Sequence, residues 1–233
     1  MEDKQTEIST LGEFGLIDHL TKDIELTNAS SKKGVGDDAA VLEYNDTEVL
    51  VTTDLLLENV HFDLTYVPLK HLGYKAAIVN ISDICAMNGT PRQLTVSLGI
   101  SKRFTVEHIE QLYSGIKVAC KLYGVDVVGG DTCASHQGLV ISITCIGDAP
   151  KDKIVYRNGA HDTDLICVSG NLGAAYMGLQ LLEREKVASA GRADFEPDFA
   201  GKEYLVERQL KPEARKDIIE ELGDDGHKRR TFV

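Results

Sequence analysis

One long apolar run constrains the fold of this chain more than any other feature. Residues 71–88 read HLGYKAAIVNISDICAMN and are followed by Gly89, which can cap a helix, and Pro91, which ends one. We predict a buried helix here, because so apolar a run offers no face suited to water. Asp83 is the only acid in the run. A buried, unpaired carboxylate costs several kcal/mol, so Asp83 must be paired or bound to a cation.

Other segments of the first two thirds of the chain also carry clear secondary-structure signals. The runs that predict strands are 49–53, 93–100, 125–128 and 138–150. The strand at 49–53 should stop at Asp54, which places that acid at a strand end. A second helix should begin after an N-cap at Thr105 and end at Gly124, because apolar residues recur between them at helical spacing.

The chain changes character near residues 149–152, where we place a domain boundary. The two predicted domains are 1–150 and 151–233, the second one partial. The elements expected after the boundary are a strand at 164–169, a turn at 169–174 and a helix at 174–188. The glycine-containing turn lacks a Walker lysine and a complete GxGxxG, so a plain turn is favoured over a phosphate-binding loop.

Charge and composition limit the kinds of partner. The 233 residues carry a net charge of −12, which opposes binding to nucleic acid or to an anionic membrane. A phosphate substrate would meet the same repulsion, so we expect it to bind through divalent cations such as Mg²⁺. No apolar run approaches the roughly 18 residues that cross a bilayer, and the acidic N-terminus has no signal-peptide core, so we expect a cytoplasmic protein. The five cysteines form no metal-binding pattern and are assigned no chemistry.

Acids recur beside glycines or at the ends of apolar runs. The four clusters are GDD at 36–38, TTD at 52–54, SD at 82–83 and GGD at 129–131. Taken singly, an aspartate after a glycine favours a turn. Taken together, the clusters favour a Mg²⁺ site, because this ion prefers carboxylate and hydroxyl oxygens. The side chains that could converge on it are those of Asp38, Thr53, Asp54, Asp83 and Asp131. Of the adjacent pair Asp37 and Asp38, one should face the metal and the other cap the glycine turn.

Other catalytic chemistries have weaker signals. No serine lies in a GxSxG elbow, and the pair Cys133 and His136 has no evident third residue to orient it. His61, in the stretch NVHF, is on pattern alone more typical of a loop or core histidine than of a ligand. No catalytic residue is therefore assigned from the sequence.

Five stretches, in this order, resemble a known family. They are STLGEFGLI, GVGDDAAV, VTTDLLLENVHF, KAAIVNISDICAMNGTP and VVGGDT, within a match that extends from Gly12 to about Gln209. The chain resembles the thiamine-monophosphate kinases of the aminoimidazole-ribonucleotide-synthetase-like superfamily. The resemblance implies an α/β fold of two domains, with an N-terminal mixed sheet and packed helices that form a barrel across a homodimer. It also implies transfer of the γ-phosphoryl group of ATP to thiamine monophosphate, with several Mg²⁺ ions, giving thiamine diphosphate.

The resemblance also implies roles for individual residues. The implied metal ligands are Asp38, Thr52, Thr53, Asp54, Asp83 and Asp131. The implied ATP contacts are Tyr113, Gly130, Asp131 and Arg157, and His61 is the implied contact to thiamine phosphate. On sequence alone, Tyr113 would be interpreted as helix-surface packing and Arg157 as a solvated charge.

The chain departs from the family pattern after RQLKPEAR. The family continues into an SDG motif and a GGEDYEL-like stretch, and neither is present in this sequence, which instead ends EELGDDGHKRRTFV. We therefore expect a truncated or frame-shifted chain that lacks much of the second domain, with impaired activity. Two alternatives stay open: another ATP-using member of the superfamily, or a noncatalytic module for nucleotide binding or dimerisation. An N-terminal cysteine like that of selenophosphate synthetases is absent, since the first cysteine is Cys85.

Overall fold

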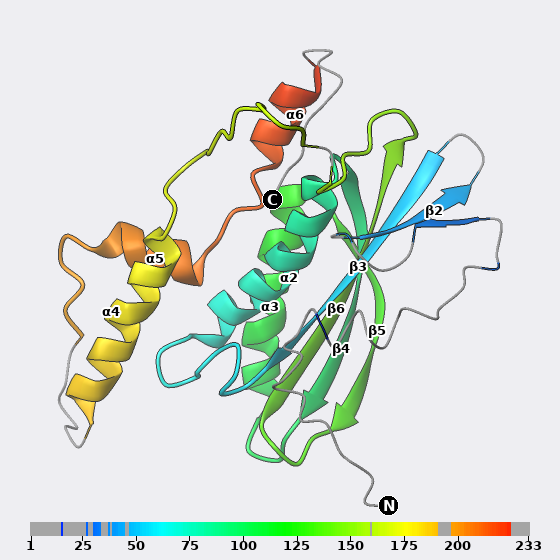
Figure 1. Ribbon diagram of the computed structural model, residues 1–233. Helices are drawn as coiled ribbons and strands as arrows, with labels where there is room; N and C mark the ends of the chain where they lie inside the picture. The colour runs from blue at the N-terminus through cyan, green and yellow to red at the C-terminus, as the bar shows by residue number, and fades with distance from the viewer. Residues whose placement is uncertain are drawn as a thin grey trace, which may run out of the picture.

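A mixed six-stranded sheet forms the centre of the molecule (Figure 1). The computed structural model describes residues 15, 27, 30–33, 37, 39–44, 47–158, 160–190 and 197–224. The strands are β1 (Ser31–Lys33), β2 (Ala40–Tyr44), β3 (Thr47–Leu57), β4 (Thr90–Ile100), β5 (Asp126–Ala134) and β6 (Leu139–Pro150). Their spatial order is β1-β2-β3-β6-β4-β5, and every neighbouring pair is antiparallel except β4 and β5. The mixed sheet confirms the predicted α/β class.

Two helices cover one face of this sheet. They are α2 (Leu69–Ala86), which packs against β3, β6 and β4, and α3 (Val106–Tyr123), which packs against α2. The two helices approach closely at Gly115, where a Cβ atom would lie 1.8 Å from the carbonyl oxygen of Lys70. We call β1–β6 together with α2 and α3 the sheet region. Its core contains fully buried side chains such as Leu50, Ile78, Ile81, Ile141 and Ile143.

Both predicted helices of the sheet region are confirmed. The run 71–88 forms most of α2, and its apolar residues are buried between the sheet and α3. Helix α3 begins after the predicted N-cap Thr105, which forms a capping box with His108, and it ends at Gly124. Gly124 has φ 69°, a left-handed conformation that glycine adopts without steric cost.

Two predicted strand ends are wrong. The run at 49–53 does not stop at Asp54, because β3 continues to Leu57 and stays paired with β6 along its whole length. Similarly, Asp131 lies inside β5, which continues to Ala134 beside β4. A charged side chain does not end a strand when the backbone hydrogen bonds of its neighbours persist on either side.

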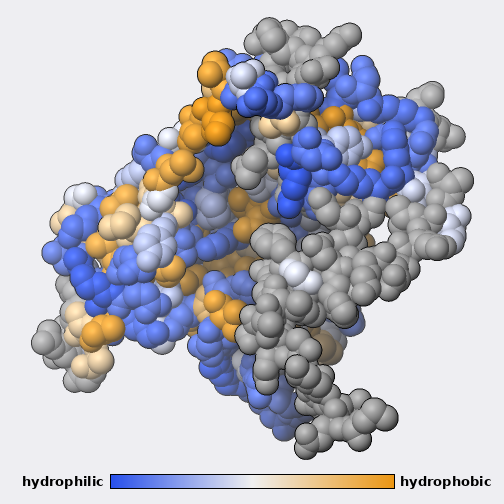
Figure 2. All heavy atoms as spheres, viewed as in Figure 1, coloured by the Kyte–Doolittle hydropathy of each residue, from blue (hydrophilic) through white to orange (hydrophobic). Residues whose placement is uncertain are grey.

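The chain after β6 forms a second region without a sheet, which we call the helical region (residues 151–224). It contains α4 (Ala174–Ser189), α5 (Glu203–Leu210) and α6 (Lys216–Asp224). Helix α4 confirms the predicted helix at 174–188. The predicted strand at 164–169 is wrong, because this segment is irregular and pairs with no strand among the described residues. Figure 2 shows hydrophobic residues gathered along it, and Leu165 and Ile166 are 90% and 95% exposed.

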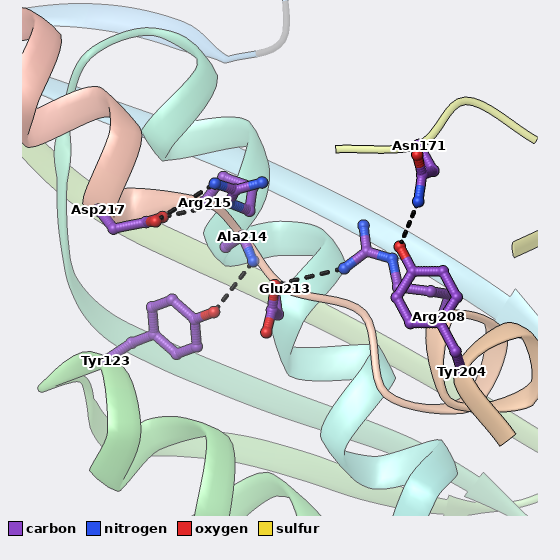
Figure 3. Close-up of polar contacts among 8 residues, drawn as sticks. All are labelled: Tyr123, Asn171, Tyr204, Arg208, Glu213, Ala214, Arg215 and Asp217. Atoms are coloured by element: carbon purple, nitrogen blue, oxygen red, sulfur yellow. Dashed lines mark hydrogen bonds and ion pairs between the residues drawn. The ribbon is translucent and has the colours of Figure 1, made fainter. Parts of the chain in front are cut away.

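Polar contacts join the helical region to the sheet region at several places, two of which lie at or next to its helices. The first is the loop before α2, where Tyr66 Oη donates to Glu183 at 2.6 Å and Lys186 binds Asp63 at 2.7 Å. The second is the end of α3, where Tyr123 Oη accepts the Ala214 N–H at 3.0 Å (Figure 3). Figure 3 also shows the neighbouring ion pairs Arg208–Glu213 and Arg215–Asp217 and the hydrogen bond between Asn171 and Tyr204.

None of the described helices is both long enough and apolar enough to pass through a membrane.

Candidate active site

Polar residues of β3 and α2 meet along one line, which we call the β3–α2 seam: Thr52, Asp54, Asn80 and Asp83. Thr52 and Asp54 lie two residues apart and therefore share one face of β3. Asn80 and Asp83 lie three residues apart and therefore share one face of α2. Thr52 Oγ1 donates to Asp83 Oδ2 at 2.8 Å, and the Asp54 N–H donates to Asn80 Oδ1 at 3.0 Å. The seam thus carries two carboxylates, one on each element.

The electrostatics of the seam favour a bound cation. Burial raises the pKa of Asp54, and only the nearby His61 opposes this shift. The protein environment therefore penalises the ionised carboxylate, a penalty that a divalent cation would remove. Carboxylate and hydroxyl oxygens are the ligands that Mg²⁺ prefers, and this ion often takes only one or two protein carboxylates. Asp54 and Asp83, with the hydroxyl of Thr52, fit that chemistry.

The seam by itself is an incomplete metal centre within the described residues. No group of three or more His, Cys, Asp or Glu side chains suited to holding a metal occurs among them. The predicted ligand Asp38 lies outside the described residues, so its role stays a prediction. Its neighbour Asp37 was expected either to face the metal or to cap the glycine turn. Its carboxylate accepts from Lys33 Nζ at 2.5 Å and from the Arg157 N–H at 3.4 Å. The glycine turn at 34–36 lies outside the described residues, so the expected cap stays a prediction.

Arg157, an implied ATP-phosphate contact, lies beside this loop. Its Nε is 3.8 Å from Asp37 Oδ1, and the Asp37 carboxylate is almost completely buried. Burial, with the charge of Asp37, also raises the pKa of Tyr156. Arg157 therefore starts from an existing ion pair, which a phosphate would have to share or replace.

Thr53, a predicted ligand, has its side chain on the other face of the sheet. Its Oγ1 donates to the Ile143 carbonyl at 3.0 Å and accepts from Thr144 Oγ1 at 3.1 Å. Side chains alternate along a strand, so Thr52 and Thr53 cannot both face α2. In one chain, only Thr52 joins the seam.

The predicted ligand Asp131 is also remote from the seam. It lies on β5, opposite Ser97, and β5 is separated from β3 by β6 and β4. Three strand spacings correspond to about 14 Å. Gly130 precedes it, and a Cβ atom there would lie 1.9 Å from the Val96 carbonyl oxygen. Glycine at this position is therefore required by the close approach of β4, whatever other role it has.

Tyr113, an implied ATP contact, lines a groove of about 690 Å³ at the end of β4. The groove is lined by apolar Ile100, Phe104, Val106 and Ile109 and by the charged pair Glu110 and Lys117. Along β4, Ile100 is six residues from the level of Thr52 and four from the level of Asp54, which corresponds to about 13 to 20 Å. The groove and the seam are separate features of one chain.

His61, the implied substrate contact, is exposed just beyond β3. Its Nδ1 accepts the Leu57 N–H at 3.0 Å, which fixes the ring and leaves Nε2 as the nitrogen for a ligand. Its charge influences the pKa of Asp54, so the ring lies close to the seam. The implied contact to thiamine phosphate stays a prediction.

Sequence reasoning missed Asn80, which contacts the backbone of a predicted metal ligand. The available signal was its position, an amide between Val79 and Ile81 in an otherwise apolar stretch, three residues before Asp83.

Comparison with known proteins relates this sheet to a family. Residues 36–149 match the family described as AIR synthase related protein, N-terminal domain. The matched residues make up a little under half of the chain and are similar to that domain. The match covers β2–β6 and both helices of the sheet region, including the complete seam.

Curated relatives to which this chain is similar are thiamine-monophosphate kinases. The one from Aquifex aeolicus is 38% identical over 92% of this chain and 64% of its own length. The one from Bacillus subtilis is 35% identical over 88% of this chain and 61% of its own length. A solved structure of AaThiL complexed with AMPPCP and TMP has a TM-score of 0.79 and 36% identity, over 94% of this chain and 65% of that chain. The resemblance predicted from the motifs is confirmed, and the chain spans a little under two thirds of these relatives.

Proposed function

We propose that this chain contributes to the ATP-dependent phosphorylation of thiamine monophosphate to thiamine diphosphate, as a phosphotransferase of thiamine biosynthesis. The support is the identity of 38% to a thiamine-monophosphate kinase over nearly the whole chain, and a similar structure that holds AMPPCP and TMP. The observation that carries the proposal is the β3–α2 seam, where hydrogen bonds between the two elements hold Asp54 of β3 and Asp83 of α2, on a chain of net charge −12. Such a chain needs cations to bind polyphosphate.

The seam residues have separable roles in this proposal. Asp54 and Asp83 would hold Mg²⁺, and Asp38, Thr52, Thr53 and Asp131 are further proposed ligands. When bound, Mg²⁺ neutralises phosphate charge and bridges phosphate oxygens. The Thr52 hydroxyl fixes one oxygen of Asp83 through their 2.8 Å hydrogen bond. Phosphoryl transfer depends mainly on positioning and charge neutralisation, so rigid carboxylates suit it.

Nucleotide and substrate contacts complete the proposal. Tyr113, in its groove, would contact ATP, as would Gly130, Asp131 and Arg157, and His61 would contact thiamine phosphate through Nε2. Thr53 and Asp131 lie away from the seam within one chain, so their participation calls for a second copy. We therefore propose a homodimer through the sheet, a domain boundary near 149–152, and a cytoplasmic enzyme that acts without nucleic acid or membrane.

A second candidate is a nucleotide-binding module without turnover, because the complete seam lies within the sheet region. The chain spans 64% of the Aquifex aeolicus enzyme. A calorimetric titration with Mg·ATP, combined with an assay for thiamine diphosphate by fluorescence after oxidation, separates the two. Binding with turnover supports the kinase, and binding without turnover supports the module.

A charge-removing variant tests the metal-binding part of both candidates. Asp83→Asn keeps the shape of the side chain, and we expect it to weaken Mg·ATP binding by more than about tenfold because a ligand is lost. The matched control is Asp148→Asn, which removes an exposed carboxylate of the same sheet that pairs with Arg92. Equal binding by both variants would remove Asp83 from the site. Selective competition by another phosphorylated substrate would favour a different superfamily member.

A further inference from the structure

Asn80 provides the amide side chain of the seam. It is 0% exposed on α2, with apolar neighbours on both sides in the sequence. Its Nδ2 donates to the Ala76 carbonyl at 3.1 Å, and its Oδ1 accepts the Asp54 N–H at 3.0 Å. Burying an amide is costly unless it is hydrogen-bonded, so these two bonds account for its place in the core.

The bond to Asp54 lies where β3 has a strand partner on one side only, within the part of the chain that the structure describes. On one side, β3 pairs with β6 along its whole length. On the other side, its pairing with β2 extends as far as Val51. Asp54 lies three residues beyond that point, and its N–H is satisfied by a helix side chain rather than by a strand. Asn80 therefore fixes the backbone of β3 at the residue where sheet pairing has become one-sided.

The contacts of Thr52 and Asn80 act on both acidic residues of the seam. Thr52 Oγ1 of β3 donates to the Asp83 carboxylate of α2, and the Asp54 N–H of β3 donates to Asn80 Oδ1 of α2. Both hydrogen bonds therefore run from β3 to α2. They fix the Asp83 carboxylate and the Asp54 backbone relative to each other.

We propose that Asn80 is a positioning residue for the divalent cation: its buried amide holds the Asp54 backbone so that Asp54 and Asp83 address the same ion. The inference rests on the proposed function, since it assumes a cation at the seam. Residues that orient metal ligands without touching the metal typically change metal affinity by about 10- to 100-fold when they are replaced.

The test measures Mn²⁺ binding to the full chain by electron paramagnetic resonance, because Mn²⁺ takes the same oxygen ligands as Mg²⁺. Asn80→Leu keeps the volume but removes the acceptor, and we expect about 10- to 100-fold weaker binding per folded molecule. Asn80→Asp keeps an oxygen that can accept the Asp54 N–H, and we expect affinity within about threefold of the wild type. The control is Ile81→Ala, which removes packing from the adjacent buried position.

The outcomes separate this inference from the proposed function. Equal losses of Mn²⁺ affinity in Asn80→Leu and Ile81→Ala would show a merely structural role and overturn the assignment of Asn80. Unchanged affinity in Asn80→Leu would overturn it as well, while the cation site would stand. Absence of Mn²⁺ binding to the wild-type chain would overturn the cation site and the Asn80 role together. If Asn80→Leu does not fold, amide exchange of Asp54 in the wild type decides: Mg²⁺ should slow it, and no change contradicts the inference.

Discussion

Similar apolar sequences are buried in the sheet region and exposed in the helical region. In the sheet region, strands such as β6 bury Ile141 and Ile143 completely between neighbouring strands and α2. In the helical region, Leu165 and Ile166 belong to an equally strand-like stretch and are almost fully exposed. The difference is the presence of neighbours, since a strand is stable only when adjacent strands accept its hydrogen bonds and cover its side chains. A local sequence pattern can indicate a strand, but the strand forms only where neighbouring strands pair with it.

The largest expected difference between the regions is in thiol reactivity. Cys85, Cys120 and Cys145 are buried in the sheet region, whereas Cys133 on β5 and Cys167 in the helical region are exposed. A thiol-specific reagent should label the two exposed thiols at least about a thousandfold faster, because the others require unfolding. Stopped-flow absorbance on the native chain measures the rates, and Cys133→Ser and Cys167→Ser should each remove one fast phase.

The buried thiols of the sheet region also make the stability of the protein depend on pH. Burial raises the pKa of Cys120 to about 11 and that of Cys145 to about 12, from an ordinary value of 9.0. Because the folded pKa values lie above the unfolded ones, the stabilising effect is complete below about pH 9 and is lost as the pH rises through 11 to 12. The urea midpoint should therefore fall above pH 9. A slow Cys167 would contradict the comparison, since it would mean that the exposed segment is covered in solution.

Two matched glycines provide the next largest effect. A Cβ atom at Gly115 would lie 1.8 Å from a carbonyl oxygen of α2, and one at Gly178 would lie 2.0 Å from the Leu205 carbonyl of α5. Gly115→Ala should lower the free energy of unfolding by about 3 kcal/mol, because the helices cannot separate without disturbing the core. Gly178→Ala should part α4 from α5 and change the main transition by less than about 0.5 kcal/mol.

Urea unfolding followed by far-ultraviolet circular dichroism measures the main transition, and hydrogen exchange by mass spectrometry locates the loosened helices. Equal losses in Gly115→Ala and Gly178→Ala would mean that the two regions unfold as one cooperative unit. That result would erase the distinction between them.

The smallest expected effect concerns the contact between the regions. Tyr66→Phe removes the 2.6 Å hydrogen bond to Glu183, and we expect a loss of about 1 kcal/mol in the docking of α4. Amide exchange in α4 should then quicken about fivefold. Tyr176→Phe, at a position of α4 that is 62% exposed, is the control. The same exchange rate in both variants would show that the Tyr66 hydrogen bond does not hold α4.

The parts of the fold that could be predicted are those whose signals are local. Helix α3 carries its own start and stop in Thr105 and Gly124. The full length of β3 could not be predicted, because Asp54 resembles a stop and the amide that satisfies its N–H lies 26 residues later in the chain. Hydrogen bonds between distant segments leave no local pattern.

The candidate site divides in the same way. Thr52 and Asp83 were grouped through the family resemblance, and the structure brings them into contact. Asp131 was grouped with them on the same grounds, but the strand order inserts β6 and β4 between β5 and β3. The order of strands in space is not encoded in the spacing of acids along the chain, so sequence reasoning could not separate these residues.

The pairing of β3 with β6 has a consequence for how the protein is made. Thr47 pairs with Pro150 and Leu57 with Val140, so these central strands are joined across roughly 80 to 100 residues of intervening chain. Closing so long a loop is slow, and during synthesis the sheet cannot close until β6 has left the ribosome. Until then, the finished β3 and α2 expose their apolar faces to other molecules. The nascent chain thus passes through an interval in which a chaperone would have its longest opportunity to bind.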